Sequence, residues 1–445
     1  MSNLFSIRNP KFERWRWQIF AITWLAYASF YFTRKAFSVA KIGIEEDATF
    51  DLTKEMMANI DASYLIAYAI GQFMWGMLAD RFGTRAVLLG GLVASVVAAV
   101  AMGLFHGAAI FLIFVFIQGL AQSTGWSSLC KNVGNFFSRT ERGRVMGLWC
   151  TNYAFGGLVA SPFAGWVAYD IFNDWRMAFF ASAAVVVVVV ALVFIFQRNK
   201  PEDIGLSSIE EYHQEPIDEL EVEGDKRANG WVEIKAVLSN KVVLLLGLIY
   251  FLLKPARYAI LLWGPYIVYQ EMDVSKAQAA TIPAAFEFAG LFGPVILGFM
   301  SDKLFRSRRM PVCAISLILL TAALAAFMPM INTGNIYLVV GMLFLIGITL
   351  YGPDSMVCGS AAIDFGTKKG AGTATGFVNG CGSVGAVMGG LLPGYFANES
   401  IFIGFAVCSF VGGMLLLPLW NLLPKSSEQK EGAAVVPKPL QPTPY

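Results

Sequence analysis

Uninterrupted apolar runs of about 20 residues recur along this chain, and they constrain its fold more than any other feature. A run of this length crosses the hydrocarbon core of a bilayer as a helix, because a helix satisfies its own backbone hydrogen bonds. Only 14% of the 445 residues are charged and 56% are hydrophobic, whereas about 25% are charged in soluble domains. The alternating ten-residue pattern of an outer-membrane barrel is absent. The sequence therefore predicts an all-α integral membrane protein in the lipid bilayer.

The predicted helices number twelve and form two sets of six. The first set covers about 17–40, 58–79, 86–105, 109–136, 145–170 and 176–196, and the second covers about 242–270, 277–300, 311–330, 335–358, 371–396 and 400–422. A polar stretch without a membrane-length run separates the sets. We therefore expect domains at 1–196 and 242–424, a linker at 197–241 and a disordered proline-rich tail at 425–445.

Lysine and arginine gather in alternate loops, and this distribution predicts the orientation. The cation-rich segments are the N-terminus, the central linker, the tail and the loops with Arg81 and Arg85, Arg142 and Arg144, Lys303 and Arg306, and Lys368 and Lys369. The intervening loops are short and nearly free of cations. By the positive-inside rule, both termini are cytoplasmic in a multi-pass protein of the cell's inner (plasma) membrane.

Two cations, Arg34 and Lys35, lie inside the first apolar run. A buried cation in a membrane helix costs roughly 2.5–3.5 kcal/mol on insertion scales, so such residues usually face a partner or a wet cavity. Tyr27, Tyr31 and Arg34 share one face of this helix with Ser38. A guanidinium flanked by phenol hydroxyls suits an oxyanion. The alternative is a structural arginine that reaches the interface or forms an ion pair.

The two sets of helices carry landmarks at nearly one spacing. Asp80 and Asp302 lie 222 positions apart in similar loops, and the second arginine inside an apolar run, Arg257, lies 223 positions after Arg34. A shared period indicates an internal duplication of six-helix units. Transporters built this way bind substrate near the membrane midplane between the repeats. The 17–40 and 242–270 segments should therefore present Arg34 and Arg257 to a common place.

Several motifs together resemble a known family. The loop Gly76-Met77-Leu78-Ala79-Asp80-Arg81-Phe82-Gly83-Thr84-Arg85 resembles the signature of the major facilitator superfamily. The organophosphate:phosphate antiporter family within it is similar in the tyrosine–arginine–lysine pattern from Tyr27, in Arg139 to Gly143, in Trp149 with Gly156-Gly157, in Arg257 to Trp263 and in Tyr351-Gly352-Pro353. The resemblance covers about residues 10–425. Their order and spacing are specific, whereas each motif alone is weak.

The resemblance implies the major facilitator fold, with twelve transmembrane helices in two pseudo-symmetric halves. It also implies exchange of inorganic phosphate for a hexose phosphate, glycerol 3-phosphate or a similar phosphoester, with Arg34 and Arg257 holding the phosphate. Two departures matter. Glycerol 3-phosphate members have a histidine where this chain has Tyr153, so histidine-dependent steps do not carry over. Lys254 lies one turn before Arg257 on the same face, so either residue can be the main contact.

Other charged residues are further candidates for the site or for a gate. Lys131 either adds positive potential to the cavity or reaches the interface as a structural lysine. Glu287 and Asp354, inside apolar runs, either form ion pairs that hold a gate closed or balance the cations of an empty cavity. Lys35 belongs to the same group of gate or ion-pair candidates. The loop residues Asp80, Arg81 and Arg85, with the counterpart Asp302, are expected to stabilise a gate without touching substrate.

The sequence also bears on other classes of function. Six scattered cysteines suggest neither a disulfide framework nor a zinc site. With no nucleophile motif, metal-ligand cluster or large globular domain, we expect no enzyme, no cofactor and no nucleic-acid partner. The expected partners are lipid and small phosphorylated solutes, and the expected state is a monomer. One alternative stays open: some members of the resembling family are hexose-phosphate sensors that signal to a partner kinase.

Overall fold

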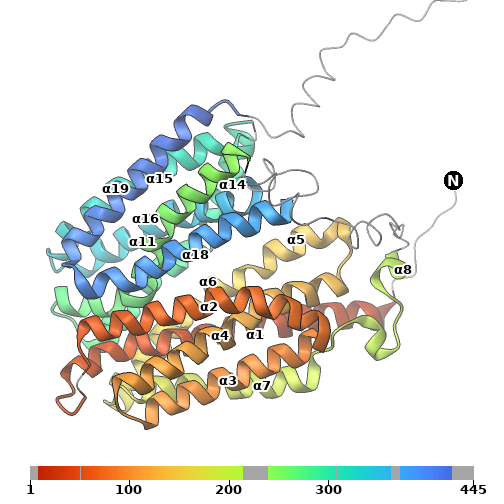
Figure 1. Ribbon diagram of the computed structural model, residues 1–445, viewed down its shortest axis with the longest axis horizontal. Helices are drawn as coiled ribbons and strands as arrows, with labels where there is room; N and C mark the ends of the chain where they lie inside the picture. Colours follow the sequence, from red (N-terminus) through yellow and green to blue (C-terminus); the bar gives the residue numbers. More distant parts are fainter. Residues whose placement is uncertain (1–8, 51, 214–238, 307, 362–370, 423–445) are drawn as a thin grey trace, which may run out of the picture.

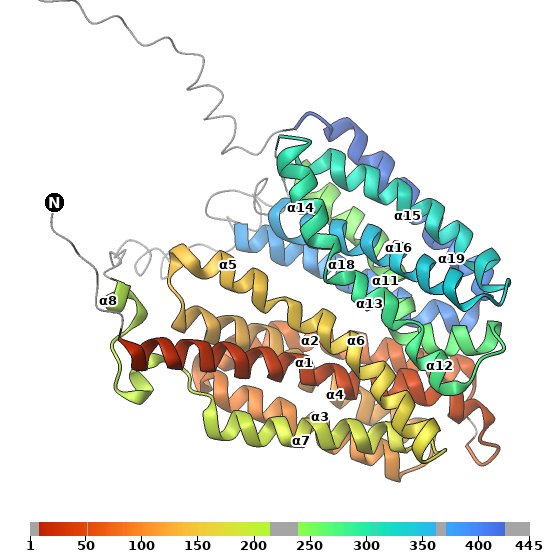
Figure 2. The same cartoon turned by 180° about the vertical axis from the view of Figure 1, so that it is seen from behind.

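The computed structural model describes residues 9–50, 52–213, 239–306, 308–361 and 371–422, and every regular element in these ranges is helical (Figures 1 and 2). The proline-rich tail, most of the central linker and the pair Lys368 and Lys369 lie outside the described residues. The domain boundaries and the orientation of the termini therefore stay predictions.

The helices up to residue 213 form the first group. Their bounds are α1 Pro10–Glu46, α2 Lys54–Phe82, α3 Thr84–Leu104, α4 Ala108–Phe136, α5 Arg139–Trp149, α6 Thr151–Gly165, the π-helical turn η1 Trp166–Ile171, α7 Met177–Phe196, the 3-10 turn η2 Pro201–Ile204 and α8 Ile209–His213.

The helices from residue 241 form the second group. Their bounds are α11 Lys241–Glu271, α12 Lys276–Thr281, α13 Ala284–Gly290, α14 Gly293–Lys303, α15 Arg309–Ile331, α16 Ile336–Ser355, the π-helical turn η3 Met356–Ala361, α18 Ala371–Tyr395, α19 Asn398–Leu416 and the 3-10 turn η4 Leu417–Leu419.

Nine helical stretches of the described residues are long and apolar enough to cross a membrane. The all-helical membrane class is thereby confirmed, while the count of twelve stays a prediction. The first helix is longer than expected. Asn9 caps its start by accepting a hydrogen bond from the backbone of Lys11, and Pro10 fits the first helical position, where no donor is needed. Buried Arg16 pairs with Glu13 and Glu141, which makes a polar first turn compatible with packing.

The two groups lie side by side, with most helices along a common direction (Figures 1 and 2). We call the side with the starts of α1, α5 and α11 the near side, and the side with the ends of α1 and α11 the far side. Between the groups, α1 packs on α11, α2 on α18, and α6 on α12 and α13. This arrangement places the middles of α1 and α11 opposite one another.

Glycines allow the closest helix contacts. A Cβ on Gly385 of α18 would lie 2.2 Å from the carbonyl oxygen of Phe251 in α11. A Cβ on Gly394 would lie 2.2 Å from the Cβ of Ala58 in α2, across the boundary between the groups. Small residues permit such backbone approach between membrane helices. The far side can therefore close tightly where Gly394 meets Ala58.

Candidate functional site

A cavity of about 310 Å³ lies between the two groups of helices. This volume is at the lower end of small-molecule sites, which span roughly 300–1,000 Å³. The first group lines it with Tyr27, Tyr31, Arg34, Leu65, Tyr68, Gln72, Trp126, Cys150 and Tyr153. The second group contributes Tyr250, Lys254, Arg257, Tyr258, Asp354, Ser355, Cys358, Gly359, Asn379, Gly382, Ser383 and Ala386. The lining is therefore aromatic and polar, with three cations and one carboxylate.

Arg34 is buried and held in place by the first group. Its Nε donates to Oε1 of Gln122 over 2.9 Å, and its guanidinium lies 4.5 Å from the ring centre of Tyr31 and 5.1 Å from that of Tyr68. Gln122 is fixed in turn by Thr33 and Tyr64. One terminal nitrogen of Arg34 is buried without a hydrogen-bond partner in the described structure. A buried unpaired donor in a cavity is a natural contact for a ligand oxygen.

Arg257 faces the same cavity from the second group. Its Nη1 lies 2.6 Å from Oδ2 of Asp354, and Nζ of Lys254 lies 2.9 Å from Oδ1 of the same carboxylate. The guanidinium also lies 4.6 Å from the ring centre of Tyr351 and 5.6 Å from that of Tyr153. Its Nε is buried without a partner in the described structure. Both arginines thus keep a donor free while their planes are supported by tyrosine rings.

Only some of the residues that the sequence predicted for the site line the cavity. Tyr27, Tyr31 and Tyr153 line the cavity beside the arginines. Ser38 does not: its hydroxyl lies 3.5 Å from the carbonyl oxygen of Leu261, beyond the cavity. Lys131 is exposed on α4 and is not among the lining residues, so its predicted contribution to the cavity has no support from this placement.

Lys35 and Glu287 form a buried ion pair on the far side of the cavity. Their charged atoms lie 3.2 Å apart, and each side chain is 2% exposed. Tyr351 donates to Oε2 of Glu287 over 2.5 Å, and Lys35 donates to the carbonyl oxygen of Leu261 over 2.9 Å. These contacts join α1 to α11, α13 and α16. They close the cavity toward the far side.

A second buried pair lies one layer farther out, and the sequence reading missed it. Lys41 pairs with Asp61, donates to the carbonyl oxygen of Leu262 over 3.1 Å and lies 3.6 Å from the ring centre of Trp263. Both side chains are buried. Beyond them, Tyr266 donates to Glu45 and Lys276 to Glu46. The signal was present, since a lysine and an aspartate inside apolar helices need partners.

The predicted gate residues of the near side lie apart from the cavity. Arg85 donates to the carbonyl oxygen of Phe194, and Arg309 lies 2.9 Å from Asp302. Arg81 is exposed at the end of α2. Asp80 belongs to the same turn of α2, but its side chain lies outside the described part of the structure. None of these placements brings a side chain to the arginines.

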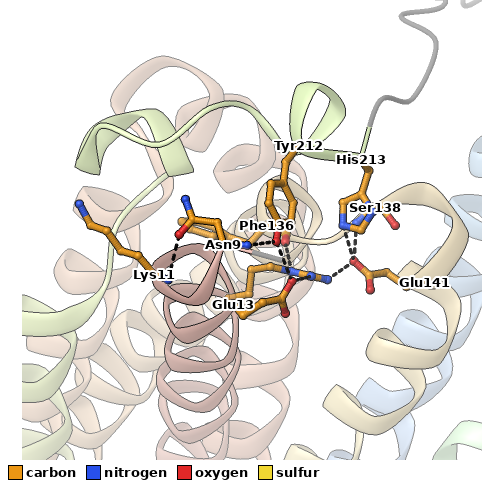
Figure 3. A network of polar contacts seen from close by, with 9 residues as sticks. Asn9, Lys11, Glu13, Phe136, Ser138, Glu141, Tyr212 and His213 are labelled. Carbon is orange, nitrogen blue, oxygen red and sulfur yellow. Dashed lines mark hydrogen bonds and ion pairs between the residues drawn. The ribbon is translucent and has the colours of Figure 1, made fainter. Parts of the chain in front are cut away.

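The short helix α8 docks on the near side, where Figure 3 shows a polar network around the start of α1. The ring of Tyr212 stacks on Phe12 at 4.0 Å, and its hydroxyl accepts a hydrogen bond from the backbone of Asn9 over 3.0 Å. His213 lies 3.7 Å from Glu141, which also pairs with Arg16 (Figure 3). The first part of the connecting segment is thus attached to the first group of helices.

The arrangement can bind an oxyanion between two helices that belong to different groups. The free nitrogens of Arg34 and Arg257 offer charged donors, and the tyrosine hydroxyls offer further ones. Gln72, Asn379 and Ser383 add neutral polar groups for the rest of a solute. Among the described residues no group of His, Cys, Asp and Glu could hold a metal ion. The charged donors of the two arginines suit recognition of an anion.

Three kinds of comparison relate the chain to known proteins. The profile described as Major Facilitator Superfamily matches residues 23–354. The chain is 29% identical to a probable hexose phosphate transport protein of Chlamydia trachomatis serovar D, covering 92% of each chain. It is 28% identical to the glycerol-3-phosphate transporter of Bacillus subtilis, covering 92% of this chain and 93% of that one. It is 27% identical to the glucose-6-phosphate exchanger SLC37A2 of Mus musculus, covering 84% and 85%.

The fold also matches a solved structure. The crystal structure of a D-xylose-proton symporter superposes with a TM-score of 0.67 over 92% of this chain and 98% of the other, at 14% sequence identity. At that identity the likeness concerns the fold alone. The names of the relatives match the organophosphate:phosphate antiporter family that the motifs resemble.

Proposed function

Because the chain belongs to the major facilitator superfamily, we propose that it is a secondary transporter that exchanges inorganic phosphate for an organic phosphate monoester. One observation carries the proposal: Arg34 of α1 and Arg257 of α11 line one cavity between the two groups of helices, each with a buried unpaired donor. Relatives named for transport or exchange of hexose phosphate, glycerol 3-phosphate and glucose 6-phosphate support the substrate class. Transport, not catalysis, is the activity.

The proposed cycle is alternating access. The ion pairs of Lys35 and Lys41 close the far side, so a solute would reach the cavity from the near side. We infer from the positive-inside rule that the near side is cytoplasmic, and on that basis we propose that this state faces inward in the inner membrane. The two groups can rock about the bound anion and expose it to either side in turn. A single chain contains both arginines, so a monomer suffices for this cycle.

Radiolabelled phosphate counterflow in proteoliposomes tests the proposal. Vesicles loaded with unlabelled phosphate should take up labelled phosphate, and glucose 6-phosphate or glycerol 3-phosphate should compete. Unphosphorylated glucose and glycerol should not compete, because they lack the charge that the arginines require. Equal competition by the bare sugars would refute the assignment.

The same experiment addresses the sensor alternative. A sensor for an external sugar phosphate would bind these solutes without exchanging them. The relatives reported above are named transporters and exchangers, so they give this alternative no support. Ligand binding in the absence of counterflow would nevertheless favour it over the antiporter.

A further inference from the structure

Asp354 lies between two cations of α11 in the cavity. One of its oxygens faces Nζ of Lys254 at 2.9 Å and the other faces Nη1 of Arg257 at 2.6 Å. The residue is 5% exposed. A carboxylate divided between two cations resembles an anion that bridges them. Asp354 therefore neutralises part of the positive charge that would otherwise attract a phosphate.

Lys254 and Arg257 meet the same carboxylate because they are three positions apart on α11 and share a face. Pairing Asp354 with Lys254 alone would still compensate its buried charge. Arg257 could then turn one or more donors to a ligand while Asp354 keeps a partner. Lys254 could thus have a role distinct from that of Arg257, which is to neutralise Asp354 while the arginine binds the solute.

The charged residues that line the cavity determine its formal net charge. Arg34, Lys254 and Arg257 are positive and Asp354 is negative, which leaves +2 among the lining residues. Lys35 and Glu287 lie next to the cavity and cancel each other. A phosphate monoester carries a charge between roughly −1.5 and −2 near neutral pH. One such group balances the cavity, whereas a solute with an added carboxylate overcompensates it.

We propose that the Lys254–Asp354 pair determines which anions the cavity selects, favouring phosphate monoesters with an uncharged organic part over those that also carry a carboxylate. The inference rests on the proposed function and narrows its substrate class. It assigns Asp354 a specificity role by repulsion, since a carboxylate in the low-dielectric cavity disfavours a second one on the solute. Arg34 and Arg257 supply the attraction that all phosphate monoesters share.

The test compares two solutes with the same carbon skeleton, glycerol 3-phosphate and 3-phosphoglycerate. Glycerol 3-phosphate has a hydroxymethyl group at the position where 3-phosphoglycerate has a carboxylate. Their inhibition constants are measured against phosphate counterflow in proteoliposomes. The wild-type chain should prefer glycerol 3-phosphate. Asp354→Asn keeps the shape and removes the charge, and should shift the ratio of the two constants toward 3-phosphoglycerate by at least about tenfold.

Two further variants separate charge from structure. Lys254→Met should abolish counterflow, because Arg257 is then the only cation paired with Asp354 and stays bound to it. The double variant Lys254→Met/Asp354→Asn keeps the formal +2 of Arg34 and Arg257 and should recover counterflow. Because the repelling carboxylate is gone, its ratio should be shifted toward 3-phosphoglycerate, as in Asp354→Asn. Asp273→Asn is the control: it neutralises an exposed aspartate between α11 and α12, outside the cavity lining, and should leave the ratio unchanged.

A second measurement covers variants that do not transport. The same two solutes are titrated against the purified protein in detergent, and the shift in unfolding temperature gives a ratio of affinities. An unchanged ratio in Asp354→Asn, or a double variant that binds like Lys254→Met, overturns the inference. Absence of phosphate counterflow in the wild type would count against the proposed antiport, while the binding ratio would still decide the role of Asp354.

Discussion

Lys35 of α1 donates a hydrogen bond to the carbonyl oxygen of Leu261 in α11, 2.9 Å away. The carbonyl is available because the residue four positions later is Pro265, which has no backbone N–H to donate within the helix. A proline in one group of helices thus creates an acceptor for a lysine of the other. Ser38 points to the same oxygen at 3.5 Å. The far-side closure therefore depends on a backbone group as well as on the ion pair with Glu287.

Lys35→Met should loosen that closure, because it leaves Glu287 and the Leu261 carbonyl without their charged partner. A hydrogen bond to a charged group contributes roughly 1.5–3 kcal/mol, so the far-side-open population should rise about tenfold or more. The measurement is labelling of a cysteine placed at Ala58 by a membrane-impermeant maleimide, with the native cysteines replaced by serine. Lys303→Met, on the near side, is the control. Unchanged labelling in Lys35→Met would assign the lysine no part in closure.

Arg34→Lys should be severe although it keeps the charge. Lysine has no planar fork, so it loses the bond to Gln122 or the free donor, and each bond of this kind contributes about 1.5–3 kcal/mol. We expect the apparent affinity for phosphate to fall roughly 10- to 150-fold in counterflow assays. Arg14→Lys, exposed near the start of α1, should behave like the wild type. Near wild-type affinity in Arg34→Lys would make Arg34 a structural residue.

Lys41 and Asp61 should stabilise the fold as a pair. Removing one partner of a buried pair costs about 3–5 kcal/mol, because it leaves the other charge uncompensated. Asp61→Asn should therefore lower the unfolding temperature strongly, and Lys41→Met/Asp61→Asn should lower it much less. Thermal unfolding of the purified variants gives the comparison. If the two single effects simply add in the double variant, the residues are not coupled.

Transport should require an anion on both sides. With an empty cavity the cations of α1 and α11 repel as the halves close, and a bound phosphate bridges them. A closed-state preference of about 100-fold for the loaded site corresponds to roughly 2.7 kcal/mol. We expect rapid uptake into phosphate-loaded vesicles, very slow uptake into empty ones, and neither in Arg257→Ala. Equal initial rates without a proton gradient would instead favour a uniporter or proton symporter.

Asp47, just after α1 on the far side, gives a pH prediction. A hydrogen bond from the Thr49 hydroxyl, with others from Trp175 and the Thr49 backbone, lowers the pKa of this carboxyl to about 2. A lowered pKa stabilises the fold above the unfolded pKa of roughly 4, and this contribution is lost as the pH falls through the folded value. Asp47→Asn should therefore lower the unfolding temperature by the same amount at pH 5, 6.5 and 8. A difference that varies across this range would contradict the assignment.

The sequence predicted the meeting of Arg34 and Arg257, because the shared spacing of the two halves carries that information. It could not pair Lys41 with Asp61, since the pairing depends on how α1 and α2 pack and on the carbonyl of Leu262. Helical periodicity also placed Ser38 with Arg34. The structure separates them because α1 runs past the cavity into the far-side contacts. The tyrosine and arginine pattern fixes a face of a helix, while the depth of each residue depends on its neighbours.

Gly394 is a suitable position for a substitution that would favour the conformation with the far side open. Its α-hydrogen meets the methyl group of Ala58, and even a single added carbon would lie 2.2 Å from it. A tryptophan at this position would act as a wedge between α18 and α2, while the helices of each half could keep their own packing. One substitution would then hold the protein with its far side open, which would provide a stable sample of that conformation for structural work and antibody selection.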